Sequence, residues 1–299
     1  MSIVVYQDVA TPIVPTGDLA LDVRNALGAS LRSMRYTSPD FAGLYQDDKG
    51  TTPVTAAGQP VGLMLDRRFG LALSSEMMVN GDFTGDSSAA WTLQSWVVSG
   101  GRLNKTAGDT LHATGRLSTP CVAGRAYLLE FDLTISASTI TPRLRVGAGG
   151  ALVDGPAFSA SGRCRAVFTA TAPHDLIQLQ PNGSAFAGSI DNISVRELPG
   201  THASQPTTTA RPTLRSGPLR IDYDGVDDFL RTVFPALGSN VTIARSIPGT
   251  GAQFLTGQTI AAGNWNDNVD SCATLVIDRA LTGPETALVT AFLNQQAGV

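Results

Sequence analysis

The densest group of side chains able to do chemistry is the acidic stretch "DYDGVDDF", residues 222–229. Calcium binding and glycoside hydrolysis both need several carboxylate oxygens that converge on one point, so this stretch could supply either. Gly225 favours a tight turn, and Asp side chains in turns commonly bond their own backbone. We therefore predict a hairpin turn here, with a calcium site and a catalytic carboxylate pair as the alternatives.

A second candidate is Trp265, which lies in "AGNWNDNVD" between Asn264 and Asn266. Sugars can stack on exposed aromatic rings while neighbouring amides bind their hydroxyls. The many Asn and Asp residues predict an exposed loop. Trp265, Asn264 and Asn266 are therefore candidate carbohydrate-binding residues. An interface anchor and a tryptophan packed onto its own domain are the alternatives.

The chain shows no arrangement of residues typical of an enzyme. His112, His174 and His202 lie far apart, and the HExxH, GxSxG, Walker A and strand-linked GxGxxG motifs are all missing. The three cysteines lack CxxC spacing, so we expect small buried hydrophobes rather than a zinc site or a disulfide framework. We expect no catalytic residue and no enzymatic activity.

Composition restricts the class of protein. With 299 residues, 42% hydrophobic and 15% charged, the chain suits a globular protein of two domains. The net charge is −4 and no basic stripe is present, so we expect no nucleic-acid partner. The N-terminus lacks the features of a signal peptide, and no apolar run is long enough to span a membrane.

The elements that must position these residues are mostly strands. Residues 87–196 contain eight short strand-like segments separated by turn residues, which predicts a β-sandwich of jelly-roll size with Trp91 and Trp96 in its core. Two helices are expected. One covers 19–27, between an Asp18 cap and Gly28. The other follows the Thr282 and Glu285 capping box near the C-terminus.

Residues 76–197 resemble jelly-roll carbohydrate-binding modules. The resemblance rests on "NGDF" at 80–83, on the two tryptophans followed by "SGGRL", and on "IDNISVREL" at 190–198. In such modules an acidic residue of the last strand often helps to hold a structural calcium ion near the first strand. The resemblance therefore implies a calcium site at Asp82 and Asp191, completed by backbone carbonyls. Local hydrogen bonds at a strand end are the alternative.

A second resemblance occurs in separated pieces. The stretch "YTSPDFAGLYQDDKGTTPVTAAGQPVGLMLD" at 36–66 is similar to a block of tailed-bacteriophage and prophage structural proteins. The pieces "THASQPTTTARPTLR", "LRIDYDGVDDFL" and a final helix resemble the laminin-G or concanavalin-like lectin region of phage tail and fibre proteins. The jelly roll lies between the pieces, so we predict that it is inserted into a lectin-like domain, with Leu65 and Thr201 as neighbours.

These observations predict an all-β fold in which a jelly-roll β-sandwich is inserted into a second, smaller lectin-like β region. The predicted parts are an N-terminal attachment arm (1–35), a discontinuous lectin-like domain (36–74 plus 200–299) and the inserted jelly roll (75–199). Because 219–280 is too short for a whole lectin sandwich, we expect residues 1–70 of the same chain to complete it, and completion by a neighbouring subunit is the alternative.

The second resemblance implies a structural component of a tailed phage particle, namely an exposed tail, fibre or spike protein that attaches to host-surface glycan. Such a protein would be located in the virion, contact other virion proteins and form a homo-oligomer, so that repeated weak contacts add up. A capsid decoration or head-fibre protein that stabilises the shell without binding a ligand is the alternative.

Overall fold

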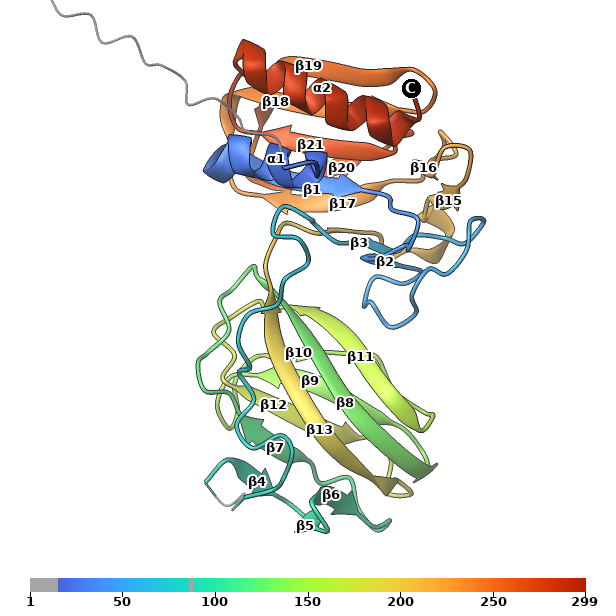
Figure 1. Ribbon diagram of the computed structural model, residues 1–299. Coiled ribbons are helices and arrows are strands. Elements are labelled where there is room, and N and C mark those ends of the chain that lie inside the picture. Colours follow the sequence, from blue (N-terminus) through green and yellow to red (C-terminus); the bar gives the residue numbers. More distant parts are fainter. Residues whose placement is uncertain (1–15, 86–88) are drawn as a thin grey trace, which may run out of the picture.

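A computed structural model describes residues 16–85 and 89–299, which form two lobes (Figure 1). We name the upper lobe the base (residues 16–74 and 200–299) and the lower lobe the jelly roll (residues 75–199). Residues 1–15 of the predicted arm lie outside the described residues. Strands are the main regular structure of both lobes, so the predicted all-β class is confirmed.

The base contains two main antiparallel sheets. The first consists, in spatial order, of β1 (Leu31–Tyr36), β21 (Ala273–Ile277), β18 (Gly238–Ile247) and β19 (Gly251–Ile260). The second consists of β2 (Leu44–Tyr45), β3 (Leu63–Met64), β14 (Ala203–Ser204), β17 (Leu230–Phe234) and β20 (Gly263–Asp267). In a small ribbon, β15 (Thr213–Arg215) pairs with β16 (Arg220–Asp222). The base also contains two short 3-10 helices, η1 (Gly28–Ser30) and η2 (Thr208–Ala210).

Strands from both ends of the chain share these sheets. β1 pairs with β21, and β3 pairs with β14 so that Met64 lies opposite Ala203. Residues 31–64 of this chain therefore share both sheets with residues 203–277. Apolar side chains from Phe234 on one sheet and Ile243 and Val276 on the other fill the space between the two sheets.

Both predicted helices are present, and both cover the outer face of the first sheet (Figure 1). In α1 (Leu19–Leu27), Asp18 caps the N-terminus by accepting hydrogen bonds from the N–H groups of residues 20 and 21. In α2 (Gly283–Ala297), Thr282 and Glu285 form the capping box and Gly298 ends the helix with a φ of 75°. Since α1 packs on α2 and β1 pairs with β21, residues 19–36 belong to the base and do not form a separate arm.

The jelly roll consists of two five-stranded antiparallel sheets packed face to face. The first, which we name the β12 sheet, contains β10 (Leu152–Asp154), β9 (Ile140–Arg145), β12 (Leu176–Pro181), β7 (Ala113–Arg116) and β4 (Trp91–Leu93). The second, which we name the β13 sheet, contains β11 (Gly162–Thr169), β8 (Ala126–Ala137), β13 (Ala187–Leu198), β6 (Arg102–Lys105) and β5 (Val97–Ser99). Successive strands cross repeatedly between the sheets, as in a jelly roll.

The core between these sheets is predicted well by the period of two in the sequence. Trp91 and Trp96 are 4% and 3% exposed, so their expected place in the core is confirmed. Cys121 and Cys164 are buried in the same core, and Cys272 is buried in the base; all three are free thiols. Burial raises the pKa of Cys121 to about 12 and that of Cys164 to about 11, which keeps both thiols protonated and unreactive.

The two chain crossings between base and jelly roll lie side by side. The backbone N–H of Thr201 donates to the buried Asp66 carboxylate at 2.8 Å, which places Thr201 beside Leu65 as an insertion requires. His202 accepts from the Asp66 N–H through Nδ1 at 2.9 Å and bonds the carbonyl of Leu198 through Nε2 at 3.0 Å. We name this group, Asp66 with Leu198, Thr201 and His202, the seam.

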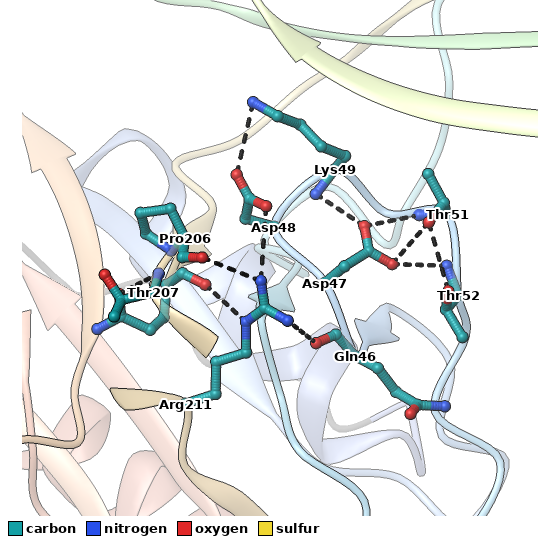
Figure 2. Close-up of polar contacts among 10 residues, drawn as sticks. Gln46, Asp47, Asp48, Lys49, Thr51, Thr52, Pro206, Thr207 and Arg211 are labelled. Carbon is teal, nitrogen blue, oxygen red and sulfur yellow. Dashed lines mark hydrogen bonds and ion pairs between the residues drawn. The ribbon is translucent and has the colours of Figure 1, made fainter. Parts of the chain in front are cut away.

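A loop of the base braces the contact between the lobes (Figure 2). The carbonyl of Lys49 accepts a hydrogen bond from the N–H of Val167 in the jelly roll at 2.6 Å. Asp47 shapes this loop by accepting hydrogen bonds from residues 49, 51 and 52, and Arg211 donates to the carbonyl of Gln46 at 3.0 Å (Figure 2). Beneath the loop, buried apolar side chains of both lobes form one cluster, so the lobes share a packed interface.

The described residues include no helix that is long and apolar enough to cross a membrane.

Candidate functional site

Trp265 lies in strand β20, which corrects its predicted place in an exposed loop. Its ring packs edge-on against Phe234 at 5.9 Å between ring centroids. The guanidinium groups of Arg35 and Arg245 lie over the ring at 5.5 and 5.9 Å, and both donate to the buried Asp267 carboxylate. These contacts hold Trp265 against the inside of the base, where its neighbours are structural.

The strand also separates Trp265 from its two flanking amides. Side chains alternate between the faces of a strand, and Asn264 and Asn266 are exposed while Trp265 is half-buried. The structure therefore does not bring Trp265, Asn264 and Asn266 together on one surface. Asn and Asp residues predicted a loop here because they are rare in strands, but pairing with β17 overrides that preference.

Asp82 and Asp191, the predicted calcium ligands, each have local partners. The Asp82 carboxylate accepts from the Thr84 hydroxyl at 3.0 Å. Asp191 accepts from the N–H of Asn192 at 2.7 Å and lies 3.8 Å from Arg102 Nε. Both arrangements match the local hydrogen bonding that the sequence left open as the alternative. Calcium at these two residues stays a prediction.

The acidic stretch at 222–229 does form a turn. The Asp224 carboxylate accepts from the backbone N–H groups of Val226, Asp227 and Asp228 at 2.8 to 3.2 Å. The predicted hairpin is wrong, because β16 pairs with β15 and β17 pairs with β14 and β20. Carboxylates of Asp224, Asp227 and Asp228 lie within 4.8 Å of one another, and the turn itself explains their proximity.

The most distinctive surface lies elsewhere, on the outer face of the β12 sheet. Gln178 pairs with Arg143 on one side and Thr114 on the other, while Leu176 pairs with Arg145 and Arg116. Residues in register share a face, so these side chains all point away from the core. We name the following set the polar face: Thr92, His112, Thr114, Arg116, Arg143, Arg145, Leu176, Gln178 and Gln180.

Hydrogen bonds between neighbouring strands order this face. Arg145 donates to Gln178 Oε1 at 2.7 Å, and Gln178 Nε2 donates to Gln180 Oε1 at 2.9 Å. Arg143 pairs with Asp154 at 2.6 Å across the edge of the sheet. Gln178 is only 3% exposed although it faces outward, because the longer side chains around it cover it. A bonded network of this kind holds its donors and acceptors in fixed positions.

His112 lies against this network from the chain just before β7. The Nη1 of Arg145 lies 3.0 Å from His112 Nε2, and an arginine can only donate, so Nε2 is the acceptor. Burial first, and then the positive charges of Arg145 and Arg143, lower the pKa of His112 below its ordinary value of 6.5. The imidazole is therefore neutral at pH 7, with its proton on Nδ1.

A hollow of about 250 Å³ lies over the part of the polar face next to β4. Its lining includes Thr92, Gln94, His112, Thr114, Arg116, Arg145 and Leu176. In Figure 1, β4 lies at the end of the jelly roll that is farthest from the helices of the base, so the base leaves this end uncovered. Pockets for drug-sized ligands measure roughly 300–1,000 Å³, so the hollow suits a smaller group.

Sequence reasoning missed the polar face. "PRLRVG", "DLIQLQP" and "HATGRL" were each read as strands, and the alternation of polar and apolar residues within each one was visible. Only the register of β9, β12 and β7 shows that their polar sides form one continuous surface.

Comparisons with known proteins find similarity in structure alone. No known family model matches the chain, and no curated protein matches it. One similar solved structure is a mutant of a family 29 carbohydrate-binding module, with 13% identity, a TM-score of 0.34, and 42% of this chain and 92% of that chain covered. Another, described as CBM4, has 15% identity, a TM-score of 0.30, and 40% and 98% of the two chains covered.

A third similar structure is the tandem CBM22 domain of Paenibacillus barcinonensis Xyn10C, with 11% identity, a TM-score of 0.27, and 77% of this chain and 94% of that chain covered. At such low identity and TM-score, these likenesses fix neither the family nor the ligand of this chain. The resemblance to phage proteins rests on the sequence motifs alone.

Proposed function

We propose that the chain is a structural protein of a tailed-phage particle whose jelly roll binds a glycan of the host surface through the polar face. The observation that carries the binding step is the hollow itself, where hydrogen-bonding groups from β9, β7 and β4 meet beside Leu176 of β12. Sugars present many hydroxyls together with apolar C–H faces, so a few fixed polar groups beside an aliphatic side chain are suited to them.

The proposal assigns binding rather than catalysis. Purified host polysaccharide that is incubated with the protein should keep its length, as measured by size-exclusion chromatography. Shortened polysaccharide would contradict this assignment and favour a depolymerase.

A glycan array tests the binding surface. Thr92 is exposed and lines the hollow, so Thr92→Tyr should fill the hollow and abolish binding. Thr134→Tyr is the matched control, because Thr134 is an exposed strand residue on the opposite sheet. We expect the wild type and Thr134→Tyr to bind the same glycans. Equal binding by Thr92→Tyr, or no binding by any variant, would refute the proposed surface.

The same array also tests whether Trp265 belongs to the binding site. If Trp265 forms part of the site, Trp265→Ala should lose the bound glycans while the melting temperature stays unchanged. Loss of folding stability with binding retained would assign Trp265 to the structure of the base. Calcium is tested on the same samples, because a chelator should lower the melting temperature only if Asp82 and Asp191 hold an ion.

Location in the particle is the remaining part of the proposal. Its support is the similarity of residues 36–66 and 201–230 to phage tail and fibre proteins, together with the projecting position of the jelly roll (Figure 1). Electron microscopy of particles carrying a label on this chain should place it on the tail or fibre. A label on the capsid would favour the decoration protein, and its absence from particles would refute a structural role.

A further inference from the structure

The hollow on the polar face contains positive charge without a balancing carboxylate among the described residues that line it. Arg116 and Arg145 both line it, and its described lining residues include no Asp or Glu. Neither arginine forms an ion pair with any described residue, although the chain as a whole has more acidic than basic residues. A charge left in this state is costly wherever water is partly excluded, unless a ligand supplies the opposite charge.

The two arginines are arranged to act together. Both lie in register with Leu176, one on each side of it, so their Cα atoms are about 10 Å apart across two strand spacings. Their flexible side chains start from the same face of the sheet and flank the same aliphatic side chain. One sugar ring placed over Leu176 would lie within reach of both guanidinium groups.

The hydrogen bonds of the polar face leave donors available on both side chains. The Nη1 of Arg145 is used by Gln178 and His112, which orients the guanidinium and leaves Nη2 without a partner among the described residues. Arg116 is exposed, and its side chain makes no hydrogen bond to another described residue. A guanidinium presents paired N–H donors that match the oxygens of carboxylates and of sulfate or phosphate groups.

We propose that the hollow selects acidic sugars, with Arg116 and Arg145 binding the anionic group of a glycan while Leu176 contacts its ring. This inference rests on the proposed function and names its ligand class. The neutral His112 accepts from Arg145 and so keeps that guanidinium pointing into the hollow.

Isothermal titration with three probes tests the selection. The probes are a galacturonic acid oligomer, the same oligomer with its carboxyl groups methyl-esterified, and a sulfated galactose oligomer. We expect the wild type to bind at least one anionic oligomer and to bind the ester at least about tenfold more weakly, since the ester lacks a charge-assisted hydrogen bond. Binding should weaken as salt is added. The two anionic probes distinguish a carboxylate from a sulfate as the recognised group.

Arg116→Gln should lower the affinity for the anionic oligomer by about tenfold or more, and Arg116→Lys should restore part of it. Arg163→Gln is the matched control, because Arg163 is an exposed arginine of the opposite sheet. Equal affinity in Arg116→Gln and wild type would overturn the inference. Binding of the neutral ester alone would overturn it while leaving the proposed function intact. Absence of binding to all three probes and to the neutral glycans of the array would remove both.

Discussion

The two outer faces of the jelly roll both carry arginines, but they differ in whether those arginines have carboxylate partners. On the β13 sheet, Arg163 pairs with Asp132 at 3.2 Å and Arg165 lies 3.9 Å from Glu130. On the β12 sheet, Arg116 and Arg145 have glutamine, threonine and leucine neighbours instead. The same residue type is therefore paired with carboxylates on the outer face of the β13 sheet, whereas on the β12 sheet only Arg143 has such a partner and Arg116 and Arg145 have none among the described residues. Charge pairing distinguishes them, whereas arginine content does not.

The register of neighbouring strands produces this difference in charge pairing. Glu130 lies directly opposite Arg165 in the pairing of β8 with β11, and Asp132 lies opposite Arg163. Cross-strand pairs of opposite charge stabilise a sheet modestly and neutralise its surface. In the β12 sheet the corresponding cross-strand partner of Arg145 and Arg116 is Leu176. A carboxylate at that single position would lie between the two arginines and offset one of their two positive charges.

The largest expected effect comes from reversing a charge on the polar face. Arg116→Glu should weaken binding of the anionic oligomer by at least about 100-fold, roughly 3 kcal/mol, because an attraction is replaced by repulsion. Titration calorimetry measures the affinity, and Arg163→Glu on the opposite sheet is the control. If both reversals weaken binding equally, the difference between the two faces is only a matter of overall charge.

The second-largest effect is expected on folding stability, when Gln178 at the buried centre of the polar face is removed. Gln178→Ala should lower the free energy of unfolding by about 1–3 kcal/mol, because it leaves the Arg145 donor without its acceptor. Urea unfolding followed by circular dichroism measures the change. Gln253→Ala, an exposed glutamine in β19, should change stability by no more than about 0.5 kcal/mol. A cost as small for Gln178→Ala would mean that the network does not hold the face in place.

The arginines on the outer face of the β13 sheet can be freed from their carboxylate partners. The double variant Glu130→Gln with Asp132→Asn should release Arg163 and Arg165, at a cost in stability of no more than about 1 kcal/mol for each exposed pair. We expect a weak, salt-sensitive gain in binding of the sulfated oligomer, measured in the Arg116→Gln background so that the polar face is silent. No gain would show that free arginines are insufficient without a hollow.

The smallest effect is expected from lowering the pH, which should reduce the free energy of unfolding. The pKa of His112 is lowered in the folded protein, so the unfolded chain binds more protons at pH values just below 6.5. Stability contributed by the neutral imidazole is therefore complete above pH 6.5 and is lost as the pH falls from there to the folded pKa. His174 and His202 have lowered pKa values as well, chiefly through burial, and contribute in the same direction. His112→Gln should make the fall in unfolding free energy less steep, and an unchanged slope would contradict the lowered pKa of His112.

Local signals in the sequence predicted local structure well. Asp18 and the Thr282 and Glu285 pair determine where the helices start, because capping depends on residues within one turn. Period-two alternation predicted most jelly-roll strands, although β10 is too short to give a pattern. The place of Trp265 could not be predicted, since its burial depends on Arg35 and Arg245, which are distant in the chain. The polar face was missed for the same reason, because strand register is a long-range property.

The seam has a mechanical consequence. Because the jelly roll is inserted, two chain segments cross from one lobe to the other, and they are held together where Thr201 and His202 both form hydrogen bonds with Asp66. A tension applied to the jelly roll near β4 is therefore divided between two covalent connections. Neighbouring hydrogen bonds are then loaded together and cannot open one after another. A domain attached by a single linker would swing on that linker, whereas this attachment resists both peeling and rotation.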